Sequence, residues 1–396
     1  MTPRIRFSGF ADDWEDRKLS DIADRFDNLR VPITASNRKP GDTPYYGANG
    51  IQDYVEGFTH NGEFILVAED GANDLKNYPV QYVNGKAWVN NHAHVLQGKK
   101  TITDNKFLMN AIKNFNIEPF LVGGGRAKLN ADVMMKLNIL LPTFVEQEKI
   151  GSFFKQLDNT IDLHQRKLDL LKEQKKGYLQ KMFPKNGAKV PELRFAGFAD
   201  DWEEHKLGDV IDIENGYAFK SEYFSDEEKR HIVLTPGSVK IGGGFQKDKG
   251  RYYDVSGVFP EKFIFKPGNI FITMTDLTPT AQSLGYPAIV PRDDNIYLHN
   301  QRLGKIINTT TNPEFLYTLL TTDTYHKEIV SSASGTTVKH SSVSKILDFK
   351  SAIPNIDEQK LIGSFFKELD NTIVLHQRKL DLLKEQKKGF LQNMFV

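Results

Sequence analysis

Asn300, Gln301 and Arg302 are consecutive polar residues whose side chains can each make a bidentate contact with the edge of a base. The triplet can equally end a strand and bond its own backbone. Two patches mix aromatic and polar residues, TPYYGANG (43–50) and NGYAFKSEYF (215–224). Their rings can contact sugar and base, although most aromatic residues of a domain belong to its core. The chemistry that these residue types share is the recognition of nucleic acid.

Two loops combine small residues with cations. VGGGRAKLN (122–130) carries Arg126 and Lys128, and SASGTTVKHSS (332–342) carries Lys339. A loop of this composition can approach a DNA backbone closely and place a cation on a phosphate or a base edge. A flexible surface turn is the alternative interpretation. The candidate DNA contacts from these and neighbouring segments are Tyr45, Tyr46, Asn49, Asn91, Arg126, Lys128, Asn215, Tyr217, Lys220, Lys240, Thr275, Asn300, Gln301, Arg302, Thr336 and Lys339.

Common catalytic motifs are absent from the sequence. It has no GxxxxGK[ST] loop, which argues against nucleotide hydrolysis of that type. It also lacks HExxH, GxSxG and the [DN]PP[YF] motif of amino-methyltransferases. Carboxylates are plentiful but unclustered in sequence, which leaves a nuclease site as an open alternative. We therefore predict a chain that binds rather than catalyses, with no catalytic residue, metal or cofactor of its own.

Length and composition favour a soluble protein of two to three domains. The chain has 396 residues, a net charge of +1 and no cysteine. A protein that binds DNA alone is usually more basic, so either its cations are clustered or partner subunits supply part of the positive field. The lack of cysteine fits a reducing compartment, and no apolar run suggests a signal peptide or a membrane span. We expect a cytoplasmic location.

Two duplications divide the chain into similar halves. PRIRFSGFADDWEDRKL (3–19) recurs as PELRFAGFADDWEEHKL (191–207), and the segment 151–183 recurs as 363–395 with four differences. Between these shared ends the two halves look unlike each other. A tandem duplication whose interiors were replaced would hold two different readers in equivalent positions.

The duplicated charged segments predict long helices. Apolar residues recur in steps of four and three, which is the heptad pattern of helices that pack along their length. Capping residues follow Pro142 and Pro354, and Pro184 ends the first helix. About 40 residues at 1.5 Å each give a rod of roughly 60 Å. The predicted seam comprises Phe154, Leu157, Ile161, His164, Leu168, Leu171, Tyr178, Phe366, Leu369, Ile373, His376, Leu380, Leu383 and Phe390.

We predict that the two helices pack on each other in antiparallel fashion, because a parallel arrangement would make the chain cross back along the rod. His164 and His376 are polar residues at seam positions, where such residues can fix the register. A ring whose edge reaches water is the alternative. The basic clusters on these helices can face phosphate, a partner protein or only solvent.

The predicted fold class is α+β, with two mixed α/β recognition domains separated by two long antiparallel helices and related by a pseudo-two-fold repeat. Short apolar runs between Pro-Gly turns predict strands in both interiors. The predicted boundaries are a first recognition domain at 1–142, a central helix at 143–184, a linker with the second recognition domain at 185–354, and a C-terminal helix at 355–396.

With these features the sequence resembles the DNA-specificity subunits of type I restriction–modification systems, over nearly the whole chain. The resemblance rests on the duplicated FxGFADDW opening, on Glu146-Gln147 and Glu358-Gln359 at the helix starts, and on the repeated rods. NGYAFKS, YYGANGIQDY, LVAEDG and NNHAHVL also look like target-recognition sequence.

The resemblance implies two target-recognition domains that each read one half of a split, asymmetric DNA site, with the helices setting the gap. It also implies two modification subunits that carry S-adenosylmethionine and methylate adenine. Restriction subunits would carry the ATP- and Mg-dependent motor and nuclease. Two other classes stay open at this point: a coiled-coil scaffold without DNA specificity, and an enzyme with an unrecognised site.

Overall fold

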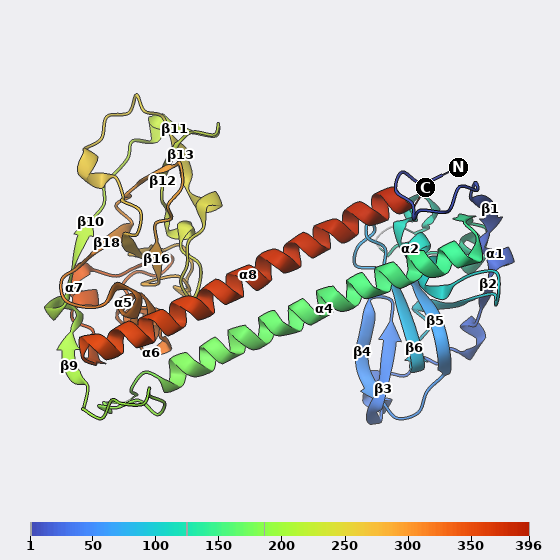
Figure 1. Cartoon of the computed structure of the whole chain (residues 1–396), viewed down its shortest axis with the longest axis horizontal. Coiled ribbons are helices and arrows are strands. Elements are labelled where there is room, and N and C mark those ends of the chain that lie inside the picture. The colour runs from blue at the N-terminus through green and yellow to red at the C-terminus, as the bar shows by residue number, and fades with distance from the viewer. Residues whose placement is uncertain (1, 124–125, 186, 396) are drawn as a thin grey trace. The chain divides into compact units, whose positions relative to one another are not determined.

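The computed structural model describes residues 2–123, 126–185 and 187–395. The chain folds into two compact units. The first unit comprises Met1–Lys167 with His376–Val396, and the second comprises Leu168–Leu375. Each of the two long helices, α4 (Phe144–Lys181) and α8 (Ile356–Met394), therefore contributes one part to each unit (Figure 1).

The first unit is a mixed α/β fold built on a six-stranded sheet. Besides the helix parts, its elements are β1 (Glu15–Lys18), α1 (Leu19–Ile22), β2 (Ala23–Arg25), β3 (Pro40–Gly47), β4 (Gly50–Val55), β5 (His60–Ala68), β6 (Val80–Val89), β7 (Ala93–Gly98), α2 (Asn105–Asn114), α3 (Ala131–Met134) and β8 (Asn138–Leu141). The sheet order is β2-β7-β5-β6-β3-β4, and only β3 and β6 pair in parallel. Strand β5 is buried on both faces, because Phe64 and Leu66 enter one apolar cluster while Ile65 and Val67 enter another.

The second unit is also mixed α/β but has two four-stranded sheets, β10-β18-β14-β16 and β11-β13-β12-β17. Besides the helix parts, its elements are β9 (Glu203–Lys206), β10 (Ile211–Asn215), β11 (Phe224–Ser225), β12 (His231–Val233), β13 (Arg251–Tyr253), β14 (Ile270–Thr273), β15 (Thr275–Asp276), β16 (Pro287–Ile289), β17 (Ile296–Leu298), β18 (Leu303–Asn308), α5 (Pro313–Leu319), α6 (Asp323–Ser332), β19 (Lys339–His340), α7 (Val343–Leu347) and β20 (Lys350–Ile353). The interiors thus differ in sheet architecture as well as in sequence.

A small antiparallel ladder closes each interior in the same way. In the first unit β1 pairs with β8, and in the second β9 pairs with β20. The strand that follows each FxGFADDW opening therefore meets the strand that leads into each long helix. The opening segment, this ladder and the start of the long helix form a frame that both units share, although their sheets differ.

A buried ion pair joins the Arg-Phe pair near the start of each half to the Glu-Gln pair in the first turn of its long helix. Arg6 Nε and Nη2 donate to the two oxygens of Glu146 at 2.7 and 2.8 Å. Arg194 binds Glu358 with the same two distances. Both glutamates are fully buried. Trp202 adds an indole N–H bond to Glu358 at 3.2 Å. Each opening segment is thereby fastened to the first turn of its helix through a bidentate, charge-assisted contact.

The far ends of the long helices complete the cores. Phe395 packs in the first unit against the rings of Trp14, Phe107 and Phe154, with centroids 6.2, 5.4 and 5.8 Å away. Phe183, which closely follows α4, takes the corresponding place in the core of the second unit, against one tryptophan and two phenylalanines. The first unit therefore needs residues from both ends of the described chain.

Within the first unit the two long helices run antiparallel. Asp158 of α4 forms an ion pair with Lys387 of α8. Further along α4, His164 lies opposite His376, with 3.3 Å between their Nδ1 atoms. The residue numbers rise on one helix while they fall on the other. One histidine must donate and the other accept in this contact, so the two predicted seam histidines face each other.

The helix parts in the second unit are also antiparallel. Lys175 and Asp370 form an ion pair at 2.6 Å, and the rings of Tyr178 and Phe365 meet edge to face at 5.0 Å. This ion pair repeats the pair of the first unit at equivalent positions of the duplicated segments. Of the predicted seam residues, Phe154, Leu168, Leu171, Phe366, Leu380 and Leu383 are buried, and Leu157, Ile161, His164, Tyr178, Leu369, Ile373, His376 and Phe390 are half-buried.

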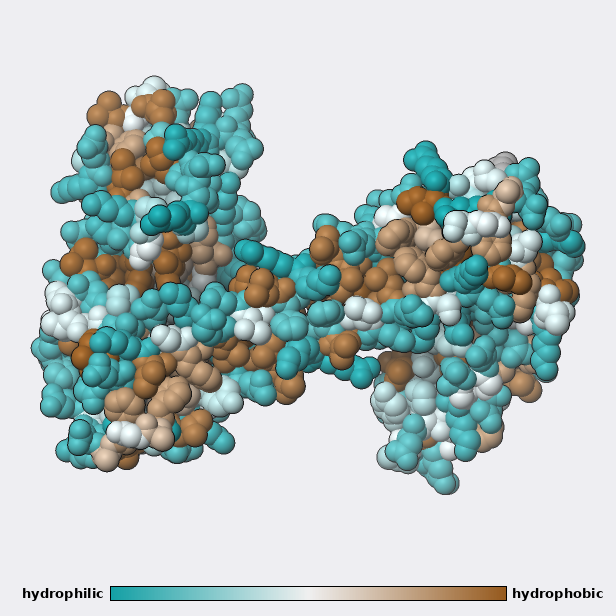
Figure 2. All heavy atoms as spheres, in the orientation of Figure 1, coloured by the Kyte–Doolittle hydropathy of each residue, from teal (hydrophilic) through white to brown (hydrophobic). Residues whose placement is uncertain are grey.

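Both long helices also expose leucines. Leu163 and Leu170 on α4 are 67% and 51% exposed, and Leu375 and Leu382 on α8 are 64% and 47% exposed. The two pairs occupy matching positions of the duplicated segments. Figure 2 shows hydrophobic atoms on the surface of these helices. Among the described residues, no helix is both long and apolar enough to cross a bilayer.

The buried His299 predicts that the second unit is weakened by mild acid. Burial lowers the pKa of His299 to about 4, and its Nε2 donates to the Leu303 carbonyl at 2.9 Å. The unfolded chain protonates this residue near pH 6.5 and therefore binds more protons than the native state between pH 6.5 and 4. Stability should be full above pH 6.5 and should fall by about 3 kcal/mol as the pH falls through that window.

Urea unfolding of the wild type and of His299→Gln between pH 7.5 and 4.5 measures this effect. We expect a flatter pH profile for the variant, because glutamine can keep a donor but takes up no proton. His231 and His326, whose pKa values burial also lowers, retain their share of the slope in both proteins. Equal slopes for the two proteins would contradict the assignment to His299.

Candidate nucleic-acid interface

In each unit we single out a long loop that connects two neighbouring antiparallel strands. Loop 69–79 joins β5 to β6 in the first unit, and loop 274–286 joins β14 to β16 in the second. Both loops carry an aspartate close to their start, Asp70 and Asp276. Each aspartate pairs through its backbone with the cation-bearing loop predicted from the sequence, Asp70 with Lys128 and Asp276 with Lys339. The candidate loops of each unit are thus joined in pairs.

In the first unit the cations of this region are tied to carboxylates. Lys128 lies 3.0 Å from Glu69, and Arg126 lies 3.2 Å from Asp70. Asp70 also bonds His92 Nδ1 at 2.5 Å. The Arg126 side chain remains 61% exposed, so it is oriented by Asp70 while its outer face is open to a ligand. A guanidinium held in this way is suited to a bidentate contact with guanine or phosphate.

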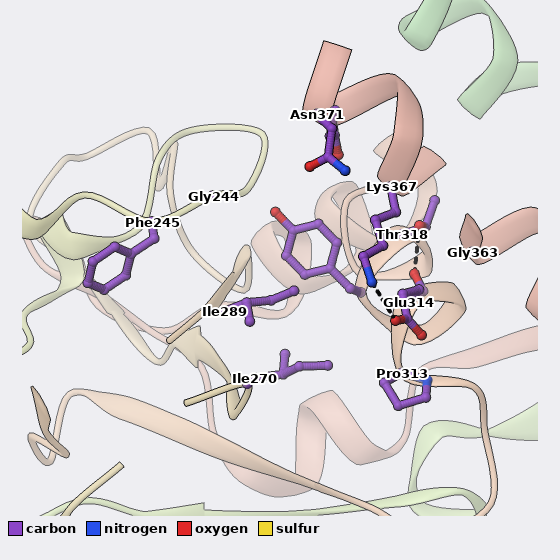
Figure 3. A pocket seen from close by; sticks show the side chains of 13 residues that line it. Gly244, Phe245, Ile270, Ile289, Pro313, Glu314, Thr318, Gly363, Lys367 and Asn371 are labelled. Carbon is purple, nitrogen blue, oxygen red and sulfur yellow. Dashed lines mark hydrogen bonds and ion pairs between the residues drawn. The ribbon is translucent and has the colours of Figure 1, made fainter. Parts of the chain in front are cut away.

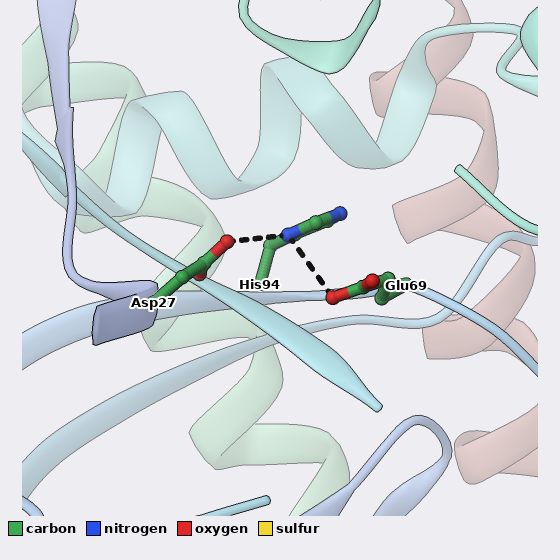
Figure 4. A group of neighbouring side chains, drawn as sticks. All are labelled: Asp27, Glu69 and His94. Carbon is green, nitrogen blue, oxygen red and sulfur yellow. Dashed lines mark hydrogen bonds and ion pairs between the residues drawn. The ribbon is translucent and has the colours of Figure 1, made fainter. Parts of the chain in front are cut away.

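Next to these residues lies a largely buried network of hydrogen bonds and ion pairs around Asp27, Glu69 and His94, which Figure 4 shows. His94 Nδ1 is 2.7 Å from Asp27 and 3.6 Å from Glu69, and its Nε2 contacts the Leu129 carbonyl at 2.9 Å. Burial opposes the ionisation of Asp27, but hydrogen bonds from His94 and the Val95 amide outweigh it, so the pKa of Asp27 lies below its ordinary value. The network fixes the strands from which the Glu69–Asp70 loop emerges.

The same three side chains have the donor types of a metal site, with ligand atoms within 4.8 Å of one another. Arg30 already binds Glu69 at 2.7 Å and lies 3.6 Å from Asp27, and Lys128 binds Glu69 as well. A cation would have to compete with two resident positive charges. The arrangement is therefore better described as an internal ion-pair network than as a metal centre.

In the second unit the candidate residues are less engaged. Asn300 Oδ1 accepts from the Arg302 amide at 3.0 Å, so Asn300 bonds its own backbone, which is the alternative that the sequence left open. The side chains of Gln301 and Arg302 are exposed. In residues 2–123, 126–185 and 187–395, no ion pair engages Arg302 or Lys339. These two cations are available to phosphate.

Two candidates are core residues rather than surface contacts. Tyr45 is 1% exposed, and its hydroxyl bonds the backbone of Ile33 at 3.0 and 3.2 Å. Thr275 is 6% exposed and contacts His340 Nδ1 at 3.1 Å. Predicting DNA contacts through these two side chains was wrong, because neither reaches the surface.

The other candidates lie at the surface or close to it, and Asn49 has a role in holding a loop. Its amide donates to the Gly71 carbonyl and accepts from the Asn73 amide, both at 2.9 Å. Asn49, Asn91, Arg126, Asn215, Lys220, Lys240, Gln301, Arg302 and Thr336 are exposed, whereas Tyr46, Lys128, Tyr217, Asn300 and Lys339 are half-buried. Their contact with DNA stays a prediction.

Sequence reasoning missed the two aspartates that organise the loops. Asp70 lies two residues after the buried end of β5, and Asp276 directly follows the buried run 270–275. A carboxylate that follows a buried strand was a usable signal. The correspondence between the two aspartates could not be seen in the sequence, because the loops that contain them differ in length and composition.

The second unit also has an apolar cavity of about 410 Å³, shown in Figure 3. Phe245, Ile270 and Ile289 line one side, and helix α8 contributes Lys367 to the other. Lys367 forms an ion pair with Glu314 at 3.1 Å across the rim. None of the candidate DNA contacts lines this cavity, so it is separate from the loops described above.

Comparisons with known proteins agree with this architecture. The family model of the type I restriction modification DNA specificity domain matches residues 11–173 and 199–385. The chain belongs to this family, and it is a DNA-recognition subunit rather than a scaffold without DNA specificity. Members of this family are generally non-catalytic.

Several relatives are similar to parts or all of the chain. It is 46% identical over 134 residues to a putative type I restriction enzyme specificity subunit of Haemophilus influenzae, a match that spans 34% of each protein. It is 24% identical to a type I restriction enzyme specificity subunit of Methanocaldococcus jannaschii, over 96% of this chain and 91% of the relative. The crystal structure of the S subunit from M. genitalium has the same fold, with a TM-score of 0.72, 15% identity and coverage of 100% and 99%.

Proposed function

We propose that the chain reads a bipartite DNA site, with one half-site contacted by each unit. One observation carries this proposal: the same ladder and the same Arg–Glu pair recur around two differently built sheets. A repeated frame around unlike interiors suits two readers with different base preferences. The exposed Arg126 and Arg302, together with Lys339, which has no ion-pair partner among the described residues, give these interiors groups that bind phosphate and base edges.

The helices are the proposed spacer between the two half-sites. In this proposal α4 and α8 form one continuous antiparallel coiled coil with approximate two-fold symmetry. The equivalent ion pairs Asp158–Lys387 and Lys175–Asp370 support it, because they favour a single register for the whole pair. The rods would hold the readers apart by roughly one and a half to two DNA turns of about 34 Å.

Two modification subunits are the proposed protein partners of the helices. The matching pairs of exposed leucines on α4 and α8 support two equivalent docking surfaces. In this proposal the modification subunits bind S-adenosylmethionine and methylate adenine, restriction subunits use ATP and Mg, and this chain binds none of these cofactors. The assembly would act on double-stranded DNA in the cytoplasm.

The test is to express the chain with its modification subunits and to map methylated adenines across the host genome. We expect one motif with two specified halves and an unspecified spacer. A motif with one half, or methylation without sequence preference, would contradict two independent readers. Methyltransferase or nuclease activity of the purified chain alone would favour an enzyme instead.

The spacer length should follow the helix length. Inserting one heptad in both α4 and α8 keeps the seam in phase and adds about 10 Å to each helix. We expect a longer spacer and two unchanged half-sites in the methylation map. Insertion of four residues, which breaks the heptad phase, is the control and should abolish a defined motif. An unchanged spacer after the heptad insertion would show that the length of the helices does not set the spacer.

A further inference from the structure

Loop 274–286 contains a short surface segment, residues 277–283, that is held by a buried carboxylate. Asp276 is 3% exposed. Its Oδ1 accepts from the amide and the hydroxyl of Thr278, both at 2.7 Å. Its Oδ2 accepts from the amide and the hydroxyl of Ser283 at 2.6 and 2.7 Å. Both ends of the segment are therefore bonded to one side chain.

The backbone between these ends is constrained as well. Ala281 is fully buried and has φ +51°, a left-handed conformation that residues with a Cβ adopt at a cost of about 1 kcal/mol or more. Such a conformation persists where the surroundings determine it. The segment is therefore an ordered element. Because its backbone is constrained, the exposed side chains that it carries are presented from fixed positions.

Several residues of the segment present exposed side chains. Leu277 is 59% exposed, and Thr280 and Gln282 are exposed as well. Across residues 2–123, 126–185 and 187–395, no hydrogen bond engages the side chain of Thr280 or Gln282. An ordered loop that presents a free carboxamide has the form of a recognition element.

The segment also lies near Lys339, for which the described part of the chain holds no ion-pair partner. Asp276 pairs with Lys339 across the β15–β19 ladder, and Asp276 bonds Ser283, the residue after Gln282. In the first unit, Asp70 occupies the corresponding place and orients the exposed Arg126. Both units thus set an aspartate between a hairpin loop and a cation-bearing loop.

We propose that segment 277–283 is a base-reading element of the second unit and that Gln282 contacts adenine. A carboxamide donates to and accepts from the N7 and N6 edge of adenine in the major groove, which is a bidentate match. Lys339 would contact phosphate beside it, and Asp276 is the positioning residue that fixes the segment. This inference rests on the proposed function and adds one specified base to one half-site.

The test uses the complex of the full chain with its modification subunits, with methylation measured genome-wide and on duplexes that vary one base at a time. For Gln282→Ala we expect one adenine of the second half-site to lose its preference by about 5- to 150-fold, while the first half-site stays unchanged. An unchanged motif would overturn the role of Gln282. A wild-type complex that gives no bipartite motif would overturn the proposed function and this inference together.

Two further variants separate positioning from mere stability. Asp276→Asn keeps the size of the side chain but offers an amide to donors, so it should relax the same position as Gln282→Ala. Asn308→Ala is the matched control, because Asn308 also closes a loop through three hydrogen bonds to Thr311. It lies at the end of β18 away from Leu303, the residue that pairs with Thr273 of β14. It should lower the melting temperature and leave the motif intact. Relaxation of the motif by Asn308→Ala, or none by Asp276→Asn, would refute positioning by Asp276.

Lys339→Gln tests the phosphate contact. Loss of a phosphate contact weakens binding to all sequences alike and reduces the salt dependence of binding by about one ion. We expect this uniform loss in a filter-binding titration with the complex. A change in base preference, or no change in affinity, would contradict the assignment.

Discussion

Arg6→Ala is expected to lower the free energy of unfolding of the first unit by about 3–5 kcal/mol, because it leaves a fully buried carboxylate without its ionic partner. Glu146 has no indole donor to replace the lost bonds, since the buried Trp14 N–H has no partner in the described residues. Arg194→Ala should cost less, because Trp202 still donates to Glu358. The internal repeat thus supplies a matched pair of variants.

Hydrogen exchange measured by mass spectrometry gives the opening free energy of each unit separately. Arg17→Ala is the surface control, because Arg17 and Glu15 form an exposed pair that should be worth about 1 kcal/mol or less. Adding Glu146→Gln to Arg6→Ala should restore part of the loss by removing the unpaired charge. No recovery in the double variant, or equal effects of Arg6→Ala and Arg17→Ala, would show that the buried charge is not the cause.

Phe395→Ala is the second large effect that we expect. Truncating a buried phenylalanine that contacts three aromatic rings should cost about 3–5 kcal/mol. The loss should appear in the first unit, in β5 and β6, although residue 395 follows the end of α8 and is far from these strands in sequence. Phe183→Ala should weaken the second unit instead.

The two phenylalanine variants are controls for each other in the same exchange experiment. Each should speed exchange in one unit and leave the other close to the wild type. Faster exchange confined to the end of α8 in Phe395→Ala would mean that the helix end frays without supporting the core, which contradicts the packing described here.

The long helices could be predicted from sequence because heptad periodicity and proline boundaries are local signals. Their partners could not be assigned in the same way. The heptad pattern predicted the seam through apolar residues and two histidines but named no partner for any of them, and the structure adds an ion pair between Lys175 and Asp370. A charge at a seam position is interpretable only when the opposite helix is known.

The candidate DNA contacts show the same limit. Residue type alone identified Arg126 and Lys339 as surface cations, but it also selected Tyr45, whose ring packs under Arg38 with the guanidinium 4.2 Å above it. An aromatic residue in a polar stretch can be a core residue when its strand alternates between faces. The Arg6–Glu146 pair spans 140 positions, so no local pattern could reveal it.

The place of Phe395 in the core of the first unit has a consequence for biosynthesis. The sheet of that unit is complete in the nascent chain long before residues 376–395 are made, yet its aromatic core lacks one ring until then. The second unit lies entirely within residues 168–375 and can reach its native packing earlier. The half that leaves the ribosome first is therefore expected to mature last, and in the interval it offers an open apolar face to chaperones.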